Sequence, residues 1–90
     1  MLIIGEKLNS SVPKTLEALN SHDEKYLTEM IKKQAECGAE YLDINTALTR
    51  EKETENMKWV IGLALENSDC GIMIDSPEPD VIVSCLPALG

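Results

Sequence analysis

Three short apolar runs alternate with longer segments of helical periodicity, and this alternation is the strongest constraint on the fold. The runs cover residues 2–4, 41–45 and 70–74. They are too short for helices, and the first suits a strand that is buried on both faces. Each intervening segment is long enough to carry the chain back across a sheet, as parallel pairing requires. The pattern therefore predicts an α/β fold built from successive parallel β/α units.

The first two helical segments have recognisable start and stop signals. Pro13 suits the first turn of a short helix that ends near Asn20. The run Ser21-His22-Asp23-Glu24 has the S-x-x-E form of a capping box, so Ser21 is predicted to cap a second helix. Gly38 is predicted to end that helix in the left-handed conformation.

Two further helices are predicted in the second half of the chain. Apolar residues repeat at helical spacing from Met57 to Leu65, and this helix fades at residues 67–68. A last helix opens near Pro79, and Pro87 is expected to disturb its interior.

The composition fits one small domain over residues 1–90 and excludes some partners. Hydrophobic residues make up 43% of the chain, with one Trp, two Tyr and no Phe, so aliphatic side chains and Met must form the core. The net charge is −8, which argues against binding to nucleic acid or to an anionic membrane. No apolar run is long enough to cross a bilayer.

The cysteines point to a reducing compartment. Cys37, Cys70 and Cys85 form no CxxC pair, and their number is odd. We expect reduced, mostly buried thiols in a cytoplasmic protein. Met1 leads directly into the first strand, so no signal peptide is expected.

Polar side chains follow each predicted strand at the point where it ends. Parallel strands have their carboxyl ends on the same edge of a sheet, where α/β proteins bind ligands. The side chains expected to converge there are Glu6, Asn9, Asp43, Asn45, Asp75 and Ser76.

Carboxylates and amides suit a flat heterocycle that carries an amino group, a ring N–H and a carbonyl. A carboxylate accepts two hydrogen bonds from such an edge, and an amide both donates and accepts. Lys7 is the one basic residue of these segments, and no glycine-rich loop is present, so a nucleotide is disfavoured.

Each of these residues also has a purely structural interpretation. Asp43 suits a strand-end cap or a partner for a helix, and Glu6 suits an ion pair with the neighbouring lysine. Asn45-Thr46 suits a plain turn, and Asp75-Ser76 suits the cap of the following helix. The occurrence of such groups at three strand ends favours the functional interpretation.

Other chemistries lack the residues they need. His22, the one histidine, lies at a helix cap and is expected on the surface. A His/Cys metal site lacks its ligands, and Mg²⁺ at Asp43 and Asp75 is disfavoured, so no bound metal is predicted. A cysteine nucleophile has no histidine base, and Ser76 has no partner base.

Three segments carry a resemblance to a known family. They read MLIIGEKLN at residues 1–9, GAEYLDIN at residues 38–45 and IMIDSP at residues 72–77. In this order they resemble the pterin-binding methyltransferases, and most closely the methyltetrahydrofolate–corrinoid methyltransferases. The folate domain of cobalamin-dependent methionine synthase and dihydropteroate synthase are more distant. The resemblance covers essentially all 90 residues.

The resemblance implies a TIM-type (β/α)8 barrel that holds a pterin in its mouth. It implies that Asp75 hydrogen-bonds the pterin ring and that Glu6, Asn9, Asp43 and Asn45 line the same mouth, with Ser76 beside them. It also implies transfer of a methyl group between N5 of tetrahydrofolate and the cobalt of a corrinoid (cobalamin) held on a partner protein, in one-carbon metabolism.

The chain is short for such a barrel, which takes roughly 250 residues. In the family, the rest of the pterin site comes from later strands. We therefore expect an N-terminal fragment, truncated after about three strands, with Gly90 in or just beyond the last helix. Alone it is expected to be inactive, and its exposed sheet edges favour a homo-oligomer.

Two alternatives stay open on the sequence alone. One is a dihydropteroate synthase relative, although residues 6–9 do not resemble the Asn-rich phosphate-binding segment expected there. The other is a non-catalytic half-barrel that works by assembling with itself or with a partner.

Overall fold

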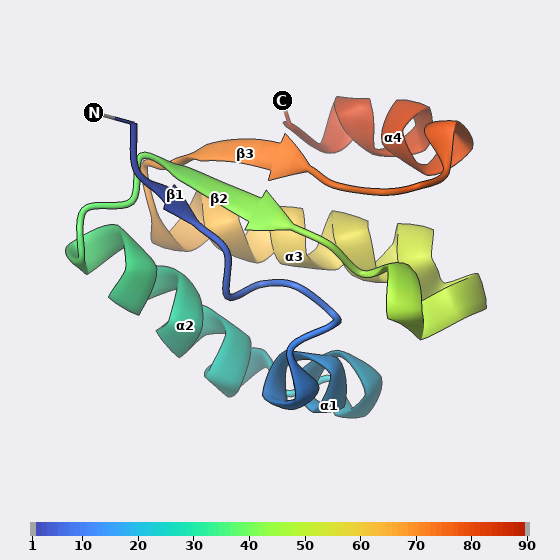
Figure 1. The fold of residues 1–90 in the computed structure, drawn as a ribbon, viewed down its shortest axis with the longest axis horizontal. Coiled ribbons are helices and arrows are strands. Elements are labelled where there is room, and N and C mark those ends of the chain that lie inside the picture. The colour runs from blue at the N-terminus through green and yellow to red at the C-terminus, as the bar shows by residue number, and fades with distance from the viewer. Residues whose placement is uncertain (1, 90) are drawn as a thin grey trace.

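The computed structural model describes residues 2–89 as an α/β fold with one parallel sheet (Figure 1). The strands lie in the order β1 (Ile4–Gly5), β2 (Tyr41–Ile44) and β3 (Gly71–Ile74). The helices are α1 (Pro13–Ser21), α2 (Glu24–Glu36), α3 (Glu53–Asn67) and α4 (Pro79–Cys85), with 3-10 helices at Ala47–Lys52 and Leu86–Leu89. The predicted parallel α/β units are confirmed. The predictions that fall on Met1 and Gly90 lie outside the described residues.

The two faces of the sheet differ because strand side chains alternate in direction. Leu42 and Ile44 of β2 are fully buried, and α3 packs against β2 and β3. Figure 1 shows α2 and α3 against this face of the sheet. Tyr41 and Met73 belong to the opposite, open face, and each is 40% exposed. The register pairs Asp43 with Met73, which places Asp43 on the open face.

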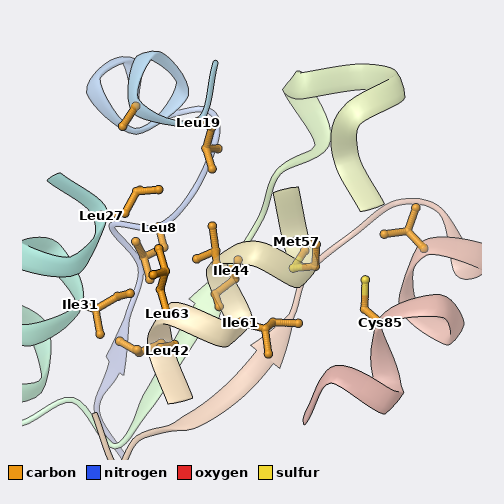
Figure 2. Close-up of a cluster of buried hydrophobic side chains, with 14 residues drawn as sticks. Leu8, Leu19, Leu27, Ile31, Leu42, Ile44, Met57, Ile61, Leu63 and Cys85 are labelled. Atoms are coloured by element: carbon orange, nitrogen blue, oxygen red, sulfur yellow. The ribbon is translucent and has the colours of Figure 1, made fainter. Parts of the chain in front are cut away.

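The hydrophobic core lies between the sheet and the helices (Figure 2). The helix predicted from Met57 onward buries that residue together with Val60, Ile61 and Ala64. It also ends at Asn67, as predicted. Leu65, the last residue of the predicted apolar repeat, lies outside the core, because its side chain is 45% exposed. Leu63 is buried instead, because α3 is a central helix that contacts both α2 and α4.

The first strand differs from its prediction. It was expected over residues 2–4 and buried on both faces, but it forms at Ile4–Gly5. Leu2 and Ile3 are 57% and 43% exposed. The reason is that β1 is an edge strand, whose one partner among the described residues is β2.

The start of α2 also differs from its prediction. Ser21 is the last residue of α1, and its hydroxyl donates to the Glu17 carbonyl at 2.8 Å. The capping residue is Asp23, whose carboxylate accepts from the Tyr26 N–H at 3.0 Å. Ser21 cannot cap α2 because His22, which follows it, takes a left-handed conformation (φ 54°) that separates the two helices.

The remaining boundary signals behave largely as predicted. Gly38 has a φ of +98° just after α2. The last helix changes to 3-10 geometry at Leu86, next to Pro87. His22 is exposed, as expected, and its ring stacks on Trp59 of α3 with 4.4 Å between centroids.

The cysteines are free thiols but differ in burial. Cys85 is buried and Cys70 is half-buried. The expectation of mostly buried thiols is wrong for Cys37, which is exposed because it caps the carboxyl end of α2.

The packing predicts unequal costs for two leucine substitutions. Leu42→Ala removes a fully buried side chain and should lower the free energy of unfolding by about 2–5 kcal/mol. Leu65→Ala, at an exposed position of α3, should change it by less than about 0.5 kcal/mol. Urea denaturation followed by circular dichroism measures both, and equal losses would contradict the assignment of the core.

Candidate functional site

The loops that follow the three strands are joined by backbone hydrogen bonds. The Asn45 N–H donates to the Leu8 carbonyl at 2.9 Å, and the Ser10 N–H donates to the Asn45 carbonyl at 2.8 Å. On the other side of β2, the Asp75 N–H donates to the Ile44 carbonyl at 3.0 Å. The expected convergence of the strand ends is therefore present in the backbone.

The Asn45 side chain links the loops that follow all three strands. Its carbonyl oxygen Oδ1 accepts from the Ser10 hydroxyl and from the Ala47 N–H, both at 2.9 Å. Its Nδ2 donates to Asp75 Oδ2 at 3.2 Å. The bond to Ala47 is the local turn that the sequence allowed, and the bond to Asp75 shows that Asn45 does more than make this turn.

Asp43 lies beside Asp75 and Glu6 in an acidic environment. Burial raises the pKa of the Asp43 carboxyl above its ordinary value, and the negative charges of Asp75 and Glu6 raise it further. Its Oδ1 atom is buried and has no hydrogen-bond partner within residues 2–89. Such a carboxyl favours either its protonated form or an incoming hydrogen-bond donor.

Asn9 and Ser76 direct their polar atoms elsewhere. The Asn9 Oδ1 atom accepts from the Ser11 N–H at 2.9 Å, which closes a local turn. The Ser76 hydroxyl donates to Glu53 Oε2 at 2.6 Å and accepts from the Glu78 N–H at 3.1 Å. The hydroxyl of Ser76 is thus held by α3 and by the turn before α4, rather than by Asp75.

Two residues that matter here were not singled out from the sequence. Ser10 is 1% exposed and bonds Asn45, and its position directly after Asn9 in a strand-end loop was a usable signal. Glu53 is 7% exposed and bonds Ser76, but no motif distinguishes it from the other acids near the start of α3.

The candidate site is an open rim rather than a deep cavity. A groove of about 650 Å³ lies along β1 and α2, where Ile3, Met30 and Lys33 contribute to its lining. Glu6 reaches this groove, but Asn45 and Asp75 do not. Within residues 2–89, no group of three or more His, Cys, Asp or Glu side chains could hold a metal ion, and no helix is long and apolar enough to cross a membrane.

The raised pKa of Asp43 predicts a pH-dependent effect on stability. A carboxyl whose pKa is higher in the folded than in the unfolded state holds its proton better when folded. It therefore destabilises the fold increasingly as the pH rises from the unfolded pKa through the folded one. Asp43→Asn should increase the free energy of unfolding more at about pH 7 than at about pH 3.

Urea denaturation at the two pH values tests this expectation. Asp69→Asn, at an exposed position just before β3, is the matched control and should show no comparable difference. A gain for Asp43→Asn that is the same at both pH values would contradict the raised pKa.

The comparisons with known proteins agree with the motifs. No family model matches the chain. A methylcorrinoid:tetrahydrofolate methyltransferase of Eubacterium limosum is 36% identical over 87 residues, which is 97% of this chain and 32% of the relative. The chain thus spans about a third of the length of this curated relative. The resemblance of this chain to the methyltetrahydrofolate–corrinoid methyltransferases is therefore confirmed along nearly its whole length.

Proposed function

We propose that the rim formed by Asp43, Asn45 and Asp75 is part of a pterin site in a methyltransferase. The reaction passes a methyl group between N5 of tetrahydrofolate and the corrinoid of a partner protein. The name of the relative, a methylcorrinoid:tetrahydrofolate methyltransferase, supports this reaction. The observation that carries the proposal is the Asn45–Asp75 hydrogen bond at the strand ends, beside the Asp43 carboxyl, whose Oδ1 atom has no partner within the described residues 2–89.

The rim suits the amino and N–H groups of a pterin edge. Asp75 uses one carboxylate oxygen for Asn45, so its other oxygen is available to accept from a ligand. Asp43 Oδ1 has no donor in the described part of the chain, and a pterin N–H would satisfy it. Glu6 is exposed beside them and adds negative charge. These groups would orient the ring, so that N5 is presented to the incoming corrinoid.

We further propose that the chain is the first part of a TIM-type (β/α)8 barrel. The strands are parallel and in sequential order, and the open face of the sheet carries the rim residues. A barrel of eight units takes roughly 250 residues, so a third of that length corresponds to about three units. The 90-residue chain alone is then inactive, because the later strands complete the mouth.

The corrinoid partner, the cytoplasmic location and the absence of a bound metal remain parts of this proposal. The corrinoid brings its own cobalt on the partner protein, and the rim needs no metal to bind a pterin by hydrogen bonds. The acidic charge of the chain favours neither nucleic acid nor an anionic membrane as a partner.

A chimaera tests the proposed reaction. The chain replaces the matching third of the Eubacterium limosum enzyme, and loss of the methylcorrinoid absorbance spectrum is followed with tetrahydrofolate present. We expect activity from the chimaera and none from the 90-residue chain alone. Asp75→Ala in the chimaera should lower kcat/KM at least about tenfold, because a hydrogen bond to a charged group contributes about 1.5–3 kcal/mol.

Asp80→Ala on α4 is the matched control, since this acid is exposed and makes none of the rim's hydrogen bonds. It should leave kcat/KM within about twofold. A folded chimaera that transfers no methyl group, or an Asp75→Ala variant with unchanged kcat/KM, would refute the proposed function.

The open edge of the sheet leads to a separate expectation for the isolated chain. Leu2 and Ile3 are exposed beside β1, and the groove along β1 and α2 adds apolar surface. Such edges favour pairing with another chain. Sedimentation of the 90-residue chain should show concentration-dependent association, and Ile3→Lys should weaken it. A monomer at all concentrations would contradict the expected homo-oligomer.

A further inference from the structure

We propose that Ser10 is a positioning residue for Asp75, acting through the Asn45 amide. This inference rests on the proposed pterin site and deepens it, because it names the group that fixes the direction of the Asp75 carboxylate. Ser10 follows β1, Asn45 follows β2 and Asp75 follows β3, so the relay joins all three strand ends.

The first step concerns the Ser10 hydroxyl. Ser10 is 1% exposed, so its hydroxyl is shielded from solvent. The Leu48 N–H donates to Ser10 Oγ at 3.0 Å, which occupies the hydroxyl as an acceptor. The single hydroxyl proton is donated to Asn45 Oδ1 at 2.9 Å. The hydroxyl is therefore held from both sides and points at one atom of the amide.

The second step concerns the orientation of the Asn45 amide. An asparagine side chain can place its oxygen and nitrogen in either of two ways, and its neighbours decide between them. Here the Ser10 hydroxyl and the Ala47 N–H both donate to Oδ1. The reverse orientation would set the NH2 group against the Ala47 N–H and the carbonyl oxygen against the Asp75 carboxylate. The amide nitrogen is therefore directed at Asp75.

The third step concerns Asp75 itself. Asn45 Nδ2 donates to Asp75 Oδ2 at 3.2 Å, and no side chain within residues 2–89 donates to the other carboxylate oxygen. Loss of the Ser10 hydroxyl leaves the amide with one donor on its oxygen instead of two. The amide then turns more freely, and the Asp75 carboxylate loses its fixed direction. One hydrogen bond of this kind corresponds to about a five- to tenfold change in an equilibrium.

Nuclear magnetic resonance of the 90-residue chain tests the relay without any ligand. Ser10→Ala should shift the Asn45 Nδ2 protons and the Asp75 Cγ resonance, and should speed exchange of the Asn45 amide protons about five- to tenfold. Ser11→Ala is the matched control, because Ser11 is the adjacent residue and is exposed. Ser10→Cys keeps a side chain of similar size whose thiol is only a weak donor. It is the variant to measure if Ser10→Ala does not fold.

The Cγ resonance of Asp75 decides the outcome of this test. A shift of the Asp75 Cγ resonance in Ser10→Ala or Ser10→Cys, absent in Ser11→Ala, supports the relay. Unchanged Asn45 and Asp75 resonances in folded Ser10 variants would overturn it.

In the chimaera, Ser10→Ala should raise the Kd for tetrahydrofolate about five- to tenfold. If Ser10→Ala leaves the Kd unchanged while Asp75→Ala weakens the binding of tetrahydrofolate, the positioning role of Ser10 is overturned and the proposed function stands. If the chimaera without these substitutions transfers no methyl group, the proposed function alone is overturned.

Discussion

Parallel pairing of β2 between β1 and β3 is the constraint on which the rest of the structure depends. It places the three strand ends at one edge, and the alternation along β2 then separates apolar from polar side chains. Leu42 and Ile44 are buried against the helices, so Asp43 and Asn45 must lie on the other side of the strand. The same backbone pairing that builds the core therefore assembles the rim.

The rim carries several acidic side chains, and its two aspartates, Asp43 and Asp75, differ in their hydrogen bonds. Asp75 receives a hydrogen bond from a neutral amide, whereas Asp43 Oδ1 is buried with no donor among the residues that the structure describes. A raised pKa for Asp43 follows from its burial and from the acids beside it. A buried carboxyl with a raised pKa lowers the stability of the fold, and such carboxyls are typical of ligand-binding sites.

The sequence predicted those features that depend on local chemistry or on periodicity. The end of α3, the left-handed Gly38 and the convergence of the strand ends all follow from patterns along the chain. The exposure of Leu2 depends on the edge position of β1, which is set by pairing between residues distant in sequence. Asp23 rather than Ser21 caps α2 because of one dihedral angle, the left-handed φ of His22. The pairing of Ser76 with Glu53 spans 23 residues and has no local signal.

The Asn45 amide donates and accepts at once, which restricts what can replace it. Asn45→Asp would set a second negative charge against Asp75, and Asn45→Leu, of similar shape, would leave two donors unpaired. Asn45→Gln adds a methylene that moves the amide away from its three partners. In a library of all single substitutions, this half-buried position in a loop would thus be depleted as strongly as a position of the core.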